Sequence, residues 1–155
     1  MSAPTRQEIL DRIYLDYADA IDGGSLADWP GFFTEEGVYR ILSKENHDRN
    51  LPLSLMYCRG MGMLTDRARA SADLNVYAPR AWRHLISNMR VREERGGYVA
   101  SANFAVLETI EGKPTQLLVA GRYADRIHWD GQIRLAHRLV VHDTSLVPGS
   151  IVFPI

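Results

Sequence analysis

Residues 115–143 read TQLLVAGRYADRIHWDGQIRLAHRLVVHD, two strand-like segments joined by Asp130-Gly131. Apolar residues fall on odd-numbered positions of both segments, which is typical of strands with one buried face. They are Leu117, Val119, Tyr123 and Ile127 in the first segment, and Ile133, Leu135, Leu139 and Val141 in the second. Because Asp-Gly favours a tight turn between antiparallel strands, the stretch predicts a β-hairpin.

The apolar faces also constrain the register of this hairpin. A two-residue turn at Asp130-Gly131 would place Ile127 opposite Arg134, and directly opposed residues point to the same face of a sheet. That pairing would put a row of arginines in the core. A shift by one residue removes the conflict, so we predict an odd-length loop or a β-bulge here.

Two further strand candidates precede the hairpin, at residues 82–92 and 98–110. Gly96-Gly97 lies in the connection between them, and Gly112 lies in the connection to the next strand. Consecutive strands joined by short glycine-containing turns indicate an antiparallel meander.

The N-terminal part carries helix signals instead. Thr5 and Glu8 have capping-box spacing, and Asp22-Gly23-Gly24 is a helix stop. Between them one helical face is apolar, with Ile9, Leu10, Ile13, Tyr14, Tyr17 and Ile21. A second short helix is expected at 25–33, and a third at 62–74. Their inward-facing residues would be Trp29, Phe32 and Phe33 in the second helix, and Leu64, Ala68 and Ala72 in the third.

The segment between these last two helices is less regular. A short strand is expected at 38–42, an irregular polar stretch at 43–50, and an edge strand or extended loop at 51–57, where Pro52 lacks an N–H donor. Helices followed by a meander are typical of an α+β fold. We therefore expect three N-terminal helices packed on a curved, mainly antiparallel sheet.

Length and composition set the class of protein. The chain has 155 residues, 46% hydrophobic and 24% charged, with a formal net charge of −1. Residues 1–155 are thus expected to form a single domain, and the balanced charge argues against a nucleic-acid partner. No apolar stretch approaches the length of a membrane span, and no signal peptide is evident. Cys58 is the only cysteine, which suggests a reducing, cytoplasmic location.

The basic residues are strongly biased toward arginine. Sixteen of the eighteen are Arg, and only Lys44 and Lys113 are Lys. Arginine is enriched at protein interfaces, where its guanidinium group pairs bidentately with carboxylates. A GC-rich genome would give the same bias, so both explanations remain open.

No motif for metal, nucleotide or nucleophilic chemistry is present. The histidines lack the i, i+4 helical spacing of a metal site, and no Cys-x-His couple exists for an iron–sulfur cluster. The glycines form neither GxGxxG nor a P-loop, and no Gly-x-Ser-x-Gly elbow occurs. Cys58 has no local context of a nucleophile.

Acid–base chemistry is the remaining catalytic alternative. His84, Asp125 and His137 fall on expected strand faces beside apolar residues, and a His beside an Asp in a dry pocket would suit a dehydratase or isomerase. The structural interpretation is that they are core polar groups. In that case Asp125 would form an ion pair with a neighbouring arginine.

Residues 83–91, RHLISNMRV, closely resemble the RHLVSN-type strand of the small (β) subunits of Rieske aromatic-ring-hydroxylating oxygenases. GRYAD at 121–125 resembles the family's G-R-Y-x-D, and RLAHR at 134–138 resembles its R-I-A-R-R run, although His137 stands where the pattern has Arg. Further similarities occur in order along the chain, at Trp29, Phe33, Tyr39, Asp66-Arg67 and Asp143.

The resemblance implies a cystatin-like, NTF2-like cone and a catalytic α subunit as partner. The α subunit would carry the Rieske [2Fe-2S] cluster and the mononuclear iron, and would receive electrons from a ferredoxin or reductase. The two chains would form an α3β3 hexamer with β–β trimer contacts. In this family the β chain has no catalytic, cofactor or metal residue of its own. The 45–47 region and the tail 148–155 resemble the branch for aromatic carboxylates such as salicylate, anthranilate or terephthalate.

We therefore expect a non-catalytic small subunit that stabilises the α subunits of a ring-hydroxylating oxygenase. The rivals are a free-standing dehydratase or isomerase and a small-molecule-binding protein. Seven residues are expected to serve packing or assembly, namely Arg83, His84, Asn88, Arg122, Arg126, Arg134 and Arg138, and the resemblance implies that His84 and Asn88 belong to the central strand. The last four would form one outward patch on the final two strands and would meet carboxylates of another subunit.

Overall fold

The chain begins with one continuous helical run. The computed structural model describes residues 1–77, 79–144 and 153–155. The run comprises α1 (Arg6–Leu10), a π-helical segment η1 (Asp11–Asp16) and α2 (Tyr17–Asp22). The expected capping box is present, because the Thr5 hydroxyl accepts from the N–H of Glu8 and the Glu8 carboxylate accepts from the N–H of Thr5. Gly24 follows with φ of 79°, a conformation that glycine adopts without strain.

The second helix is a 3₁₀ helix, η2 (Leu26–Phe32), with Pro30 inside it. It leads directly into β1 (Phe33–Ser43), so Phe33 belongs to the strand and not to the helix. All three expected aromatic residues are nevertheless buried. Trp29 packs edge-to-face on both Phe33 and Tyr39, with ring centroids 5.3 and 5.0 Å apart.

Six strands form one sheet in the order β2-β1-β6-β5-β4-β3. The four long strands are β3 (Arg80–Glu94), β4 (Gly97–Ile110), β5 (Gln116–Trp129) and β6 (Ile133–His142). They pair antiparallel in sequence order, which confirms the predicted meander. The edge strand β2 (Met56–Arg59) is also antiparallel to its neighbour, whereas β1 pairs with β6 in parallel.

The central segment contains two departures from expectation. The polar stretch after β1 forms a short helix, α3 (Lys44–Asp48), because the Ser43 hydroxyl caps it at the N–H of Asn46. Helix α4 (Gly60–Tyr77) extends further than predicted at both ends. Leu64 and Ala68 are buried as expected, but Ser71 is buried in place of Ala72, which is exposed.

The β5–β6 hairpin has the predicted irregular register. Trp129 opposes Ile133 across a three-residue loop, and the register shifts again between Arg126 and Ile127. The loop and the bulge together bring Asp125 opposite Arg138. Beyond the bulge the even-numbered residues of β6 therefore face inward, which the sequence pattern did not anticipate.

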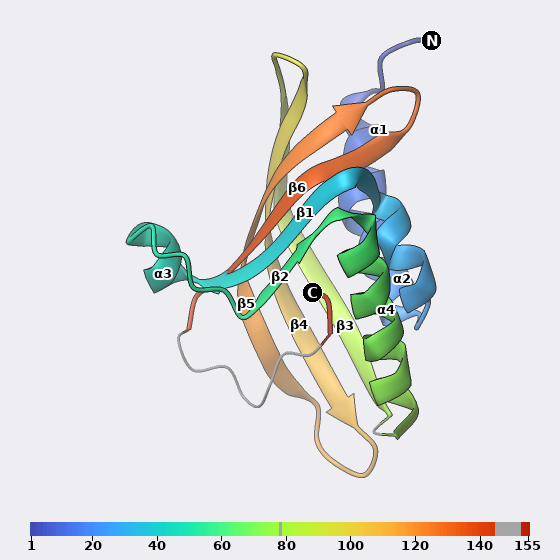
Figure 1. Ribbon diagram of the computed structural model, residues 1–155. Helices are drawn as coiled ribbons and strands as arrows, with labels where there is room; N and C mark the ends of the chain where they lie inside the picture. The colour runs from blue at the N-terminus through green and yellow to red at the C-terminus, as the bar shows by residue number, and fades with distance from the viewer. Residues whose placement is uncertain (78, 145–152) are drawn as a thin grey trace.

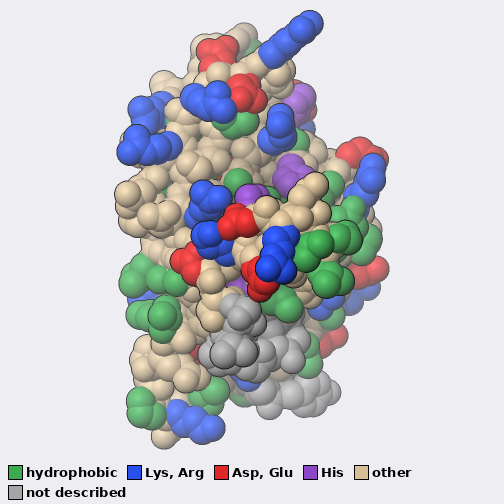
Figure 2. Space-filling view, turned by 90° about the vertical axis from the view of Figure 1, so that its left-hand side faces the viewer, with side chains coloured by type: hydrophobic (Ala, Val, Ile, Leu, Met, Phe, Trp, Pro, Cys, Tyr) green, Lys and Arg blue, Asp and Glu red, His purple; other side chains and the backbone are tan. Residues whose placement is uncertain are grey.

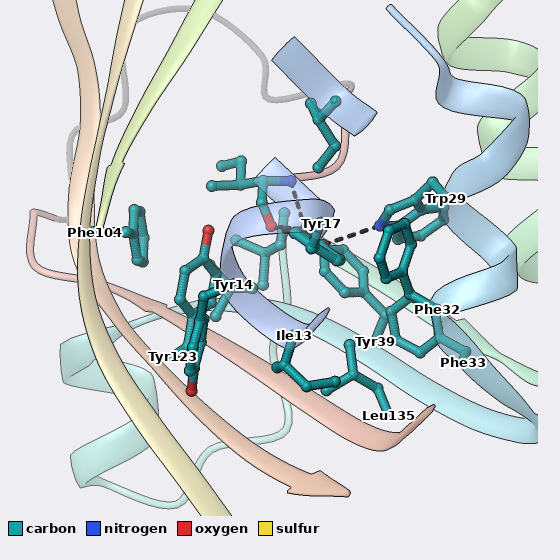
Figure 3. Close-up of a cluster of buried hydrophobic side chains, with 14 of the residues drawn as sticks. Ile13, Tyr14, Tyr17, Trp29, Phe32, Phe33, Tyr39, Phe104, Tyr123 and Leu135 are labelled. Atoms are coloured by element: carbon teal, nitrogen blue, oxygen red, sulfur yellow. Dashed lines mark hydrogen bonds between the residues drawn. The ribbon is translucent and has the colours of Figure 1, made fainter. Parts of the chain in front are cut away.

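The helices cover one face of the curved sheet, and the core lies between them (Figure 1). This confirms the α+β layout with helices on a mainly antiparallel sheet. Aromatic side chains from η1 to β5 dominate the core, as Figure 3 shows for Tyr14, Tyr17, Trp29, Tyr39 and Tyr123. Among the described residues, no helix is long and apolar enough to cross a membrane.

Candidate functional site

A fully buried ion pair lies on the face of the sheet that the helices cover. Arg138 donates from Nε to Oδ1 of Asp125 at 2.8 Å and from Nη2 to Oδ2 at 2.9 Å, and neither side chain is exposed. The same Nη2 also donates to the carbonyl oxygen of Ile13 in the first helical run at 3.1 Å. The pair thus ties the last two strands to the N-terminal helix.

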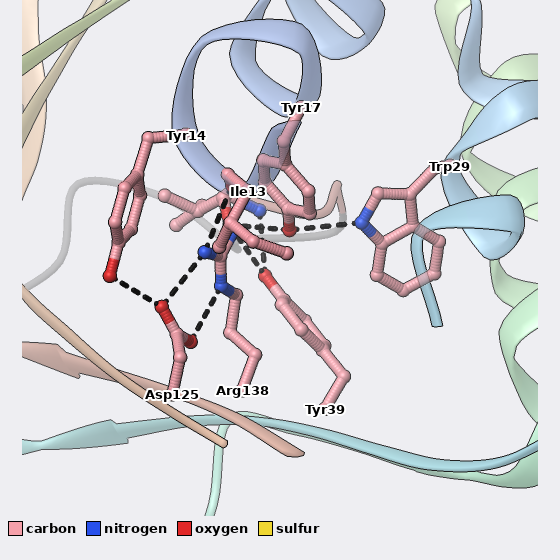
Figure 4. Close-up of polar contacts among 8 residues, drawn as sticks. Ile13, Tyr14, Tyr17, Trp29, Tyr39, Asp125 and Arg138 are labelled. Carbon is pink, nitrogen blue, oxygen red and sulfur yellow. Dashed lines mark hydrogen bonds and ion pairs between the residues drawn. The ribbon is translucent and has the colours of Figure 1, made fainter. Parts of the chain in front are cut away.

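Tyrosine rings enclose this ion pair. The Arg138 guanidinium lies 4.2 Å from the ring centroid of Tyr17, 4.4 Å from that of Tyr123 and 5.2 Å from that of Tyr14. The Tyr14 hydroxyl donates to Oδ2 of Asp125 at 2.8 Å (Figure 4). Cation–π contacts and a bidentate carboxylate together offset the cost of burying the charge.

The pKa shifts of Arg138 and Tyr14 are caused by burial and by the charge of Asp125, which indicates a structural role for this cluster. Burial alone would lower the pKa of Arg138, but the charge and hydrogen bonds of Asp125 outweigh burial and hold that pKa above its usual value. Burial, reinforced by the charge of Asp125, raises the pKa of Tyr14. Both carboxylate oxygens of Asp125 accept hydrogen bonds from Arg138 or Tyr14 and its side chain has no exposed surface, so this carboxylate is engaged in structural contacts.

Arg138 therefore does not belong to an outward patch, and that expectation is wrong. The register shift that was predicted to keep arginines out of the core instead turns Arg138 inward. The arginine is stable there because Asp125 lies directly across the strand pair and neutralises it. The interpretation of Asp125 as a structural ion pair is confirmed.

His84 forms a second polar couple, with Asp22 at the end of α2. Its Nδ1 lies 2.6 Å from Oδ1 of Asp22, and its backbone N–H donates to Oδ2 at 2.8 Å. The imidazole is 1% exposed, and its Nε2 has no hydrogen-bond partner. The couple fixes the end of the first helical run against β3.

Asn88 lies four residues further along the same strand, in a left-handed conformation with φ of 54°. The β3–β4 register shifts between Ser87 and Arg90, so Asn88 sits in a β-bulge, a position that asparagine tolerates better than most residues. We expected His84 and Asn88 on a central strand, but β3 is the outer strand of the sheet. That expectation is wrong, because β1 and β2 extend the sheet on the other side.

The three candidate acid–base residues do not form a common site. His84 is bound to Asp22, and Asp125 is bound to Arg138 and Tyr14. His137 opposes Arg126 on β5 and lies on the other face of β6 from Arg138. No hydrogen bond or ion pair joins any two of the three, all of which the structure describes. The residues for a His/Asp catalytic cavity are thus present but not assembled.

The outer face of the sheet carries most of the remaining predicted residues. Arg83 and Arg122 are exposed, and the Arg126 side chain is 73% exposed. The Arg134 side chain is 30% exposed and pairs with Asp130 in the hairpin loop. Figure 2 shows Lys and Arg side chains over the upper half of this face.

A depression of about 680 Å³ is lined by Arg126 and by further residues of β3 to β6. Its basic lining comprises Arg6, Arg90, Arg92, Arg126 and His137. Glu94 pairs with Arg92 at 2.9 Å and lies 3.9 Å from Arg126. Burial, followed by the charge of Arg40, lowers the pKa of His137. The depression therefore presents guanidinium groups beside an imidazole whose pKa is lowered.

The described part of the chain contains no set of side chains that could ligate a metal ion. Across residues 1–77, 79–144 and 153–155, no group of three or more His, Cys, Asp or Glu side chains could hold a metal ion. A Rieske cluster needs two cysteines, whereas this sequence has only Cys58, which is buried. The residues present do not fit such a cluster.

Asp22 is the polar residue that sequence reasoning missed, having been taken only as part of a helix stop. The available signal was its position. A carboxylate in the last turn of a helix interacts unfavourably with the helix dipole, so a hydrogen-bond donor elsewhere in the fold is expected to compensate for it. His84 supplies two such contacts, and only the folded chain reveals them.

Comparison with known proteins adds the family. The small subunit of anthranilate 1,2-dioxygenase from Burkholderia cepacia is 30% identical over 141 residues, which cover 90% of this chain and 88% of that relative. A β subunit of the terminal oxygenase component of terephthalate 1,2-dioxygenase from Comamonas sp. is 29% identical, covering 90% and 92%. No family model matches the chain.

A solved structure is similar over almost the whole fold. It is the β subunit of a protein assigned as an aromatic-ring-hydroxylating dioxygenase from Novosphingobium aromaticivorans, with a TM-score of 0.84 and 32% identity, covering 96% of both chains. The NTF2-like fold inferred from the resemblance is thereby confirmed. This chain belongs to the family of small (β) subunits of aromatic-ring-hydroxylating dioxygenases.

Proposed function

We propose that this chain is the non-catalytic small subunit of a multicomponent oxygenase and stabilises the α subunits that hydroxylate an aromatic substrate. The observation that carries the proposal is the match to β subunits over 96% of the chain. The engaged state of Asp125 and the separation of His84 from His137 support it, because none of these three described residues is paired with another as acid and base. The dehydratase alternative is not favoured.

The redox centres of such an oxygenase would lie in the α subunit. A Rieske [2Fe-2S] cluster and a mononuclear iron there would supply electron transfer and oxygen activation, and a ferredoxin or reductase would deliver the electrons. We propose an α3β3 arrangement with β–β contacts, as the family resemblance implies. The single cysteine supports a cytoplasmic location.

We also propose that the outer face of the sheet is the docking surface for the other subunits. Arg83, Arg122 and Arg126 are exposed there, and Arg126 lines the basic depression. Exposed guanidinium groups on one surface repel one another unless carboxylates meet them, and subunit contacts supply such carboxylates. His84 and Asn88 lie on the adjoining edge strand, where they hold its position and its bulge.

An aromatic carboxylate is the proposed substrate class. Two of the relatives are named for anthranilate and terephthalate, which are both aromatic acids. Of the two segments that resemble the carboxylate branch, 45–47 lies in the short helix α3, whereas most of 148–155 lies outside the described residues.

Co-purification tests the proposed function directly. A tagged copy of this chain, expressed with its genomic neighbours, should retain an iron-containing larger chain, while the same chain purified alone should carry no stoichiometric iron. One equivalent of iron in the isolated chain would contradict the proposal. Dehydratase or isomerase activity of the isolated chain would contradict it as well.

A further inference from the structure

Residues 153–155 lie inside the concave side of the sheet. Phe153, Pro154 and Ile155 are all buried, and the C label in Figure 1 lies near the labels of β3 and β4. Phe153 and Ile155 belong to the same hydrophobic cluster as the residues of the first helical run. A short piece of chain, distant in sequence from everything around it, thus occupies the interior of the cone.

Two buried tyrosines hold this segment by its backbone. The Tyr39 hydroxyl accepts from the N–H of Ile155 at 2.7 Å and donates to the carbonyl oxygen of the same residue at 3.1 Å. The Tyr17 hydroxyl donates to that oxygen at 3.0 Å and accepts from Nε1 of Trp29 at 2.9 Å. Tyr17 and Tyr39 have no exposed surface, so water cannot replace these partners without opening the core.

Two residues before Ile155, the Phe153 side chain packs against an aromatic side chain of β3. The Phe153 ring packs on Trp82 with centroids 4.3 Å apart, and the Arg80 guanidinium lies 5.8 Å from the same ring. The indole Nε1 of Trp82 donates to Oε2 of the buried Glu108 at 3.3 Å, and Arg80 pairs with that carboxylate at 3.1 Å. Trp82 is therefore held in place independently of Phe153.

We propose that Tyr17, Tyr39 and Trp82 form a peptide-binding site inside the cone, and that its ligand is this chain's own segment 153–155. The site recognises one N–H, one carbonyl oxygen and one aromatic ring, which is the chemistry of a short apolar peptide. This inference goes beyond the proposed subunit function. Segment 153–155 occupies the interior of the cone, where a small ligand could otherwise bind. The cone interior therefore contributes to the stability of the fold.

The coupling between Tyr39 and the segment tests the site. Tyr39→Phe in the full chain should lower the Tm by about 3–6 °C, because the backbone groups of Ile155 lose their partner. In a chain shortened by residues 153–155, Tyr39→Phe should lower the Tm by less than about one third of that value. Tyr57→Phe, on an exposed tyrosine that contacts Arg40, is the control and should leave the Tm unchanged in both chains.

The result that would overturn the site is an equal effect of Tyr39→Phe in the two chains. If the shortened chain does not fold, a chain lacking Ile155 alone replaces it, and the same comparison applies. As a binding test, N-acetyl-Phe-Pro-Ile at millimolar concentration should raise the Tm of the shortened chain and leave that of the full chain unchanged. A rise of equal size in both chains would show binding elsewhere and refute the assignment.

Discussion

Asp125 and Arg138 show at the residue scale why a charge can lie in this core. The carboxylate accepts from Nε and Nη2 of the arginine and from the hydroxyl of Tyr14, so the pair has few unsatisfied groups. Sequence alone suggested an ion pair for Asp125 but could not name its partner. The partner depends on a register shift of one residue, which reverses the faces of β6.

Removing the carboxylate charge should be costly. Asp125→Asn leaves Arg138 charged and uncompensated in the core, so the free energy of unfolding should fall by about 3–5 kcal/mol. Urea unfolding measures it. The matched control is Asp130→Asn, which breaks the exposed pair with Arg134 and should cost no more than about 1 kcal/mol. Similar losses in the two variants would mean that the buried pair is not a structural tie.

His137 should make stability depend on pH. Its pKa is lowered in the folded protein by burial and by the charge of Arg40, so the unfolded chain binds its proton more readily. Stability from this residue is therefore complete above about pH 6.5, the unfolded value, and declines as the pH falls below it. His137→Gln should weaken that decline in urea titrations between pH 8 and 5, whereas His128→Gln, on an exposed side chain, should not. An unchanged pH profile for His137→Gln would place the titrating group elsewhere.

At the scale of the elements, β5 and β6 approach each other closely at Gly121. Gly121 on β5 opposes His142 on β6, and a Cβ at this glycine would lie 1.9 Å from the carbonyl oxygen of Val141. The pairing of β5 with β6 therefore requires glycine here. This contact arises from the bulged register, so the G-R-Y motif shows that a glycine is present but not which backbone it touches.

Gly121→Ala should disrupt this pairing. The new methyl group must displace the backbone of β6, which we expect to lower the free energy of unfolding by about 2 kcal/mol or more. Gly62→Ala is a matched control in α4, where an added Cβ meets nothing within 4 Å. That substitution should be neutral or stabilising by up to about 1 kcal/mol, because alanine favours helix. Chemical denaturation of both variants distinguishes them, and destabilisation of equal size would refute the steric explanation.

Local signals explain which elements could be predicted. The capping box, the glycine stop and the alternating strands depend on neighbouring residues, so the first helical run and the meander agree with expectation. Helix α3 was missed because its polar residues, Lys44 to Asp48, bury nothing and form a helix only through the Ser43 cap and two i, i+4 ion pairs. The parallel pairing of β1 with β6 joins strands about a hundred residues apart, and no short-range pattern encodes it.

At the scale of the whole molecule, the polar groups are divided between an occupied interior and an open outer face. Inside the cone Asp125 is engaged by Arg138, and Asp22 is engaged by His84. Outside, Arg83 and Arg122 are exposed on the other face of the sheet. The motif order of the sequence indicated the family. It did not separate interior from surface arginines, because Arg122 and Arg138 have the same chemistry and differ only in register.

Charge reversal on the outer face tests the proposed docking surface. Arg122→Glu combined with Arg126→Glu alters two exposed side chains four residues apart on one face of β5, and should dissociate the assembled oxygenase while leaving the folded chain intact. The reason is that carboxylates of the other subunits would then face like charges. Light scattering of the co-expressed complex measures the particle mass, and thermal unfolding reports the integrity of the chain. Arg59→Glu with Arg69→Glu makes the same charge change at exposed positions on β2 and α4 and should leave the mass unaltered. A complex of full mass carrying the Arg122 and Arg126 substitutions would mean that the subunits meet on another face.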